Sequence, residues 1–176
     1  GAVLIANSLG SGVLESGALL GFLPRLCERL LGEELKLPSI ATWWCGEPAA
    51  LEDAIEKMGH LVFKPVDRSH NIDIVFGNDL DEDSLLDLRS KLQARPERYI
   101  AQELVHVSQA PVLSRGAEVG LEPRCAGLRV FAVATPGGYM VMPGGLTRVA
   151  SSAKARVVSM QRGGGSKDTW VLSPGQ

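Results

Sequence analysis

Hydrophobic positions recur with helical spacing in the first half of the chain and with strand spacing in the second. Apolar residues three and four apart predict helices over 14–31, 47–58 and 81–94, and Pro24 is expected to kink or restart the first. Short apolar or alternating runs predict strands over 40–45, 60–66, 72–76, 99–107, 128–134, 139–142, 147–150, 156–160 and 169–172, with loops over 113–123 and 161–168. Helices followed by strands indicate a mixed α/β or α+β fold.

Composition narrows the class of protein. The 176 residues suffice for about one domain with a small lobe. The net charge is −2, and no stretch contains five or six basic residues close together. The sequence therefore does not indicate the basic surface with which proteins bind nucleic acids or anionic membranes. The uncharged run 130–147 is long enough to span a membrane, but two Pro-Gly-Gly turns interrupt it, so it predicts a strand pair.

The start of the chain and its cysteines bear on location. The chain opens on apolar residues without an initiator Met or a basic segment, so we expect a piece of a longer protein and no signal peptide. Cys27, Cys45 and Cys125 are odd in number and widely spaced, which favours free, buried thiols in a reducing compartment, the cytoplasm.

Glycine is enriched towards the end of the chain, where 11 of the 20 glycines fall in residues 116–176. Gly163, Gly164 and Gly165 precede Ser166 and Lys167, and such a run lets backbone N–H groups and a lysine face an anion. A flexible surface loop is the alternative. The run is not a Walker A motif, because the lysine follows serine and a strand is expected next.

Charged and polar residues at strand positions are further candidates. Lys64 ends an apolar strand, so it either reaches solvent along its stem or points into a cleft. Gln102 and Glu103 interrupt another apolar strand, where inward polar groups need a partner. Arg129 and Arg148 bracket the uncharged run, and their planar guanidinium suits phosphate or carboxylate; solvation at a sheet edge is the alternative.

In order, these segments resemble one family. The stretches are LVFKPV at 61–66, YIAQE at 99–103, LRVF at 128–131, MPGGLTRVA at 142–150, QRGGGSKDTWVL at 161–172, and IANSLGSG at 5–12. Together they resemble the circularly permuted ATP-grasp proteins of type 2, which are similar to the glutathionylspermidine synthase group. The resemblance implies an α+β fold of ATP-grasp type, with mixed or antiparallel sheets and flanking helices. It divides the chain into a helical segment (1–60), a lysine-bearing lobe (61–110) and a β-rich lobe (111–176).

The resemblance also implies an activity and its residues. ATP-grasp ligases hold ATP and Mg²⁺ and convert a carboxylate to an acyl phosphate, which an amine then attacks to give an amide or peptide-type bond. The expected partners are ATP, a small-molecule or peptide carboxylate, an amine, and the rest of the same polypeptide. The implied site comprises Lys64 at the ATP phosphates, Gln102, Glu103 and Leu104 along the adenine, Arg129 and Arg148 at the phosphate or acyl phosphate, Gly163, Gly164, Gly165, Ser166 and Lys167 in the same cleft, and Asn7 at Mg²⁺.

Two departures from the family pattern keep an alternative open. Residues 67–73 contain no glycine where relatives carry a phosphate loop, and Glu15-Ser16 stands where many relatives have Asp-Lys. Carboxylates for Mg²⁺ and substrate are expected before Gly1, so this segment alone is expected to be inactive. The alternative is an ATP-grasp relic that acts as a nucleotide-binding or interaction module.

Overall fold

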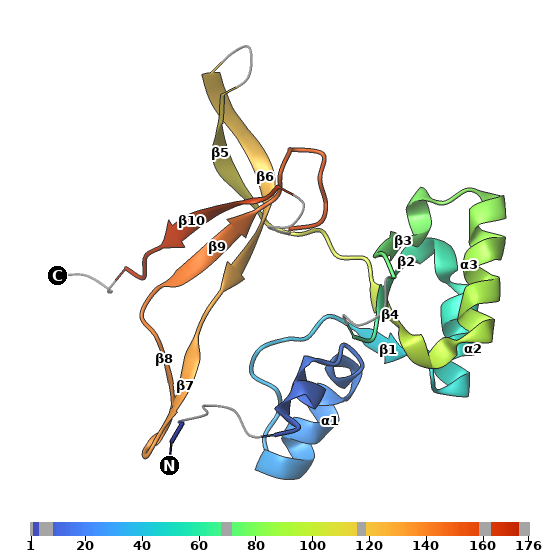
Figure 1. Cartoon of the computed structure of the whole chain (residues 1–176), viewed down its shortest axis with the longest axis horizontal. Coiled ribbons are helices and arrows are strands. Elements are labelled where there is room, and N and C mark those ends of the chain that lie inside the picture. The colour runs from blue at the N-terminus through green and yellow to red at the C-terminus, as the bar shows by residue number, and fades with distance from the viewer. Residues whose placement is uncertain (1, 4–8, 68–71, 116–118, 159–162, 173–176) are drawn as a thin grey trace. The chain divides into compact units, whose positions relative to one another are not determined.

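The computed structural model of the chain divides into two compact units, Gly1–Val105 and His106–Gln176 (Figure 1). It describes residues 2–3, 9–67, 72–115, 119–158 and 163–172, without the side chains of 114, 115 and 119. Both units contain antiparallel sheets, and helices accompany the sheet of the first, so the predicted α+β class is confirmed. Within the described ranges, no helix combines the length and apolar character that a membrane span requires.

The sheet of the first unit has four strands in the order β1-β4-β2-β3. They are β1 (Thr42–Trp44), β2 (Leu61–Pro65), β3 (Val75–Phe76) and β4 (Tyr99–Glu103), and every neighbouring pair is antiparallel. Gln102 lies opposite Thr42 on one side and Val62 on the other, while Lys64 lies opposite Ile100. This register puts Lys64 and Gln102 at diagonal positions on one face, within reach of long side chains.

Three α-helices accompany this sheet: α1 (Leu19–Leu31), α2 (Pro48–Glu56) and α3 (Glu82–Ala94). Short 3-10 turns cover Ser11–Glu15, Met58–His60, Gly77–Asp79 and Pro96–Arg98. Of the kink or restart expected at Pro24, the restart is wrong, because α1 runs through Pro24 as one element. The break lies earlier, between Glu15 and Leu19, and the kink stays a prediction. At that break the Gly17 N–H donates to the Val66 carbonyl at 2.7 Å, which takes it out of a continuous helix.

The two faces of the sheet serve different purposes. One face packs the side chains of Leu61, Phe63, Tyr99 and Ala101 against apolar residues of α2 and α3, forming the main core. The other face carries Lys64 and Gln102, and α1 approaches it closely. A Cβ on Gly21 would lie only 2.6 Å from the Thr42 carbonyl oxygen, so glycine permits this helix-to-sheet distance.

The second unit consists mainly of strands. Its four-stranded antiparallel sheet has the order β10-β9-β6-β5, from β5 (Gln109–Arg115), β6 (Val119–Arg129), β9 (Gly145–Val149) and β10 (Gly165–Thr169). A separate hairpin joins β7 (Ala132–Thr135) to β8 (Gly138–Val141), close to the predicted strand pair. In the described part of this unit only Val149 and Ala150 are buried.

Four sequence expectations fail at least in part in this unit. The predicted loop over 113–123 belongs mostly to the β5–β6 hairpin, and part of the glycine-rich loop over 161–168 is strand β10. Residues 170–172 and the described residues 156–158 are not strands. Strand β10 lies at a sheet edge and reads Gly-Ser-Lys-Asp-Thr, so its pairing with β9 defines it and no apolar alternation reveals it.

Candidate functional site

Lys64 heads a chain of hydrogen bonds across the first unit's sheet. Its ammonium group donates to Oε1 of Gln102, whose side chain is buried at 4% exposure. The Gln102 Nε2 donates to the Thr42 Oγ1 at 2.8 Å, and the Thr42 hydroxyl donates to the Ile40 carbonyl at 2.8 Å. The partner that sequence reasoning required for the inward Gln102 is therefore found within the protein.

The electrostatic environment of Lys64 differs from that of the surface lysines. Burial lowers the pKa of Lys64, because desolvation disfavours its charged form. By contrast, hydrogen bonds to Asp53 and Asp87 raise the pKa of Lys57 and Lys91. Among the residues the structure describes, no carboxylate forms an ion pair with Lys64. A half-buried cation without an anionic partner can receive an anion from solution.

The two residues after Gln102 were also predicted to contact the nucleotide. The exposed Glu103 continues β4, and its N–H donates to the Ala41 carbonyl at 3.0 Å. Leu104, half-buried, follows the strand, and the Leu61–Glu103 register places its N–H opposite the His60 carbonyl. The Glu103 N–H is therefore occupied by a protein acceptor and is not available to a ligand.

In the second unit Arg129 and Arg148 lie on one sheet face. Arg148 is opposite Gly127, and Arg129 is opposite Leu146, which puts the two arginines at diagonal positions on neighbouring strands. The Arg148 Nε is buried and has no hydrogen-bond partner among the residues that the structure describes. Arg129 is exposed, and its guanidinium lies over the Phe131 ring at 5.4 Å from the centroid.

Strand β10 distributes the glycine-rich candidates over both faces. Ser166 is opposite Arg148 and shares its face, whereas Lys167 is opposite Thr147 and donates to the Pro111 carbonyl on the other side. Gly165 pairs with Val149, and Gly163 adopts a positive φ of +78°, in the left-handed region that glycine favours. Gly164 lies between them, outside the strand.

The predicted site residues thus fall into two groups, one in each unit. Lys64 and Gln102 contact each other in the first unit, and Leu104 lies two residues beyond Gln102. Arg129, Arg148 and Ser166 share a sheet face in the second unit. Asn7, the predicted Mg²⁺ ligand, lies outside the described residues. No group of three or more metal-ligating side chains gathers within the described ranges, so we assign no magnesium ligands.

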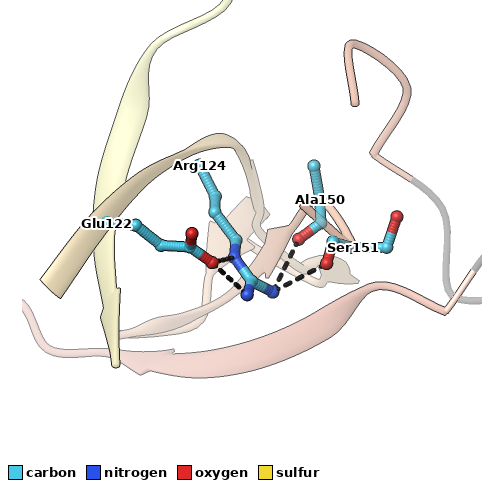
Figure 2. Close-up of polar contacts among 4 residues, drawn as sticks. All are labelled: Glu122, Arg124, Ala150 and Ser151. Carbon is cyan, nitrogen blue, oxygen red and sulfur yellow. Dashed lines mark hydrogen bonds and ion pairs between the residues drawn. The ribbon is translucent and has the colours of Figure 1, made fainter. Parts of the chain in front are cut away.

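Sequence reasoning missed two polar residues, Thr42 and Arg124. Thr42 completes the hydrogen-bond chain from Lys64, but a threonine that begins a short apolar strand carries no distinctive signal. Arg124 contacts Glu122 and the carbonyl oxygens of Ala150 and Ser151 (Figure 2). An acidic residue two positions before an arginine on a strand would have indicated a pair on one face.

The first unit thus places a lysine on a central strand of an antiparallel sheet, and the second unit places two arginines on one sheet face. Each of these side chains is a cation of the kind that can contact an anion. A family model described as circularly permuted ATP-grasp type 2 matches residues 1–150, and the chain belongs to this family, as the resemblance predicted.

Relatives match along almost the whole chain. An uncharacterized protein of Mycobacterium leprae (strain TN) is 38% identical over 99% of this chain and 30% of its own length, and one of Mycobacterium tuberculosis (strain H37Rv) is 36% identical over 99% and 31%. A Frankia casuarinae protein named "Putative glutamate--cysteine ligase 2-2" is 36% identical over 95% of this chain and 19% of its own length. The chain spans about a third of the mycobacterial relatives.

Proposed function

We propose that this chain provides the nucleotide-binding residues of an ATP-dependent ligase that joins a carboxylate to an amine through an acyl phosphate. Family membership and the ligase name of the Frankia relative support an ATP-dependent, ligase-like function. That name supports the class of reaction and no particular substrate, because this chain covers about a fifth of the named protein.

Lys64 is the observation that carries this proposal. Its ammonium is half-buried, its only hydrogen-bond acceptor in the described protein is the neutral Gln102 amide, and burial lowers its pKa. A triphosphate would supply the missing negative charge, and neutralising phosphate charge is the main task of the protein in phosphoryl transfer. In this proposal Gln102 orients Lys64 through their hydrogen bond.

In the second unit, Arg148 and Arg129 are assigned to the developing charge of the reaction. A carboxylate oxygen attacks the γ-phosphorus and ADP leaves; the amine nitrogen then attacks the acyl carbon, phosphate leaves and the nitrogen loses a proton. Both steps place charge on phosphoryl oxygens, and the unpartnered Arg148 Nε is a donor suited to them. Magnesium is expected from the family, and no step here depends on its placement.

A second candidate is a nucleotide-binding relic without ligase activity. The absence of glycine from residues 67–73 favours it, because a backbone cradle for phosphate usually needs glycine. The two candidates share nucleotide binding at Lys64 and differ only in turnover.

The test measures ADP release by the protein that contains this chain, with Mg·ATP, pools of amino acids or short peptides as carboxylates, and hydroxylamine as a general amine. A ligase forms a hydroxamate and ADP in equal amounts, and Lys64→Gln abolishes both. Lys36→Gln is the matched control, because Lys36 is exposed and forms an ion pair with Glu33. Nucleotide binding without ADP release would support the relic, and neither binding nor release would exclude both candidates.

A further inference from the structure

The Arg124 side chain donates hydrogen bonds to three residues of the second unit. Its Nε donates to the Glu122 Oε1 at 2.6 Å, and its Nη2 donates to the same oxygen. Its Nη1 donates to the Ser151 carbonyl at 2.9 Å and, more weakly, to the Ala150 carbonyl at 3.4 Å (Figure 2). The Arg124 side chain is only 19% exposed, so these bonds are partly shielded from water.

These contacts hold the end of β9 against β6. The Ala150 N–H donates to the Cys125 carbonyl at 2.8 Å, so Ala150 is bonded through its N–H to the residue after Arg124 and through its carbonyl to Arg124 itself. Val149 and Ala150 are 3% and 0% exposed. The chain therefore leaves β9 at a point that is buried and fixed by several hydrogen bonds.

Arg148 lies two residues before this point. Its neighbours in register are Gly127 and Ser166, which have little or no side chain with which to hold a long guanidinium. Its Nε lacks a partner in the described part of the protein, so no hydrogen bond seen there to that atom holds the guanidinium. The position of the β9 backbone therefore contributes to where the Arg148 guanidinium lies.

We propose that Arg124 is a positioning residue that sets the location of the Arg148 guanidinium by tying the end of β9 to β6. This inference rests on the proposed function for its catalytic consequence. Arg124 does not itself bind the anionic substrate, because Glu122 already neutralises it. An arginine is required because Nε and Nη2 bind the Glu122 carboxylate while Nη1 binds the carbonyl oxygens after β9. A lysine has a single ammonium group and cannot bridge both sites.

The first test measures the environment of the Arg148 guanidinium and does not depend on enzymatic activity. The Arg148 Nε–H signal in a nitrogen–proton NMR spectrum is assigned by its loss in Arg148→Lys. Arg124→Lys is expected to move this signal and speed its exchange with water, and Glu122→Gln to move it less. Lys154→Gln, which removes an exposed charge from the segment after β9, is expected to leave it in place. An unchanged signal in Arg124→Lys would overturn the proposal.

The second test uses turnover in a double-mutant cycle. Arg124→Lys is expected to lower kcat about tenfold, since small misplacements of a catalytic group have effects of this order or larger, while the Kd for Mg·ATP stays within about twofold. In an Arg148→Gln background, Arg124→Lys should change kcat less than about twofold, because its effect acts through Arg148. Equal losses in both backgrounds would contradict a positioning role.

The two tests separate the proposals. A wild-type protein without turnover, in which Arg124→Lys still moves the Arg148 signal, would overturn the proposed ligase function and support positioning. Turnover that depends on Arg148, with an Arg148 signal that is insensitive to Arg124, would support the function and overturn positioning. Thermal unfolding of each variant confirms that the comparisons are made on folded protein.

Discussion

Replacing Gln102 with leucine tests the hydrogen-bond chain that holds Lys64. The variant keeps the approximate size of a side chain that is 4% exposed, and it removes both the acceptor of the Lys64 ammonium and the donor to Thr42. A hydrogen bond to a charged group contributes about 1.5–3 kcal/mol and a neutral one about 0.5–1.5 kcal/mol. Because Lys64 is only half-buried, water replaces part of the lost acceptor, and we expect a loss of about 2–3 kcal/mol.

Chemical denaturation and calorimetry measure this loss directly. For a chain of this size it corresponds to a fall in Tm of roughly 4–12 °C. Glu103→Gln is the matched control, because Glu103 is the exposed neighbour on the same strand and should change stability by less than about 0.5 kcal/mol. The double variant Lys64→Met/Gln102→Leu should be more stable than Gln102→Leu alone, since it no longer holds an ammonium without an acceptor.

Two results would refute this reasoning. A loss below about 0.5 kcal/mol in Gln102→Leu would show that the chain of hydrogen bonds adds nothing to the stability of the sheet. Strict additivity of Lys64→Met and Gln102→Leu would show that the two side chains do not interact, whatever the individual losses.

Three further predictions concern the same unit. Burial lowers the pKa of Lys64 below its ordinary value of 10.5, so between the folded-state and unfolded-state pKa values the unfolded chain binds more protons than the folded one. In denaturant titrations, the stability of wild type relative to Lys64→Met should therefore rise with pH across that range. A stability difference that does not change with pH would contradict this prediction. Gly21→Ala should lose about 1–2 kcal/mol on thermal unfolding because its Cβ would lie 2.6 Å from the Thr42 carbonyl, whereas Gly59→Ala, with nothing within 4 Å, should lose none. Burial raises the pKa of Cys45 to about 11, so an aromatic disulfide reagent at pH 8 should label the other two thiols first and Cys45 only on unfolding; prompt labelling of all three would be inconsistent with this burial.

The elements of the first unit could be predicted because local signals agree with their packing. Helix α3 begins where the Asp81 carboxylate accepts from the Ser84 N–H at 2.9 Å, and α2 begins at a proline in its first turn. Strands β2 and β4 are nearly continuous apolar runs that are buried on the core face, so their apolar residues predict them from the sequence.

The second unit was harder to predict for a physical reason. Its strands are largely exposed, and β7 and β8 are exposed at every position, so no alternation of buried and exposed residues marks them. Their pairing depends on register between distant segments, such as Ser166 with Arg148, which no local pattern encodes.

The sequence could predict which residues belong to the candidate site, but it could not predict which of them contact one another. Lys64, Gln102 and Arg148 could be selected because charged or polar groups in apolar strands are unusual. The Lys64–Gln102 hydrogen bond, and the separation of Ser166 from Lys167 on opposite faces, follow from the register of antiparallel strands. Arg124 differs from Arg129 and Arg148 in having an acidic residue two positions before it, but this signal counts only on a strand, and residues 113–123 were predicted to be a loop.

The central claim is that Lys64 receives the phosphates of a nucleotide, and its most direct test is the stabilisation of the protein by Mg·ATP. At one hundred times the Kd, binding should raise the free energy of unfolding by about 2.7 kcal/mol, or the Tm by roughly 5–10 °C. Lys64→Gln should lose most of this rise, and Lys36→Gln should keep it. Equal stabilisation of wild type and Lys64→Gln by Mg·ATP, or no stabilisation of wild type at millimolar nucleotide, would contradict the account.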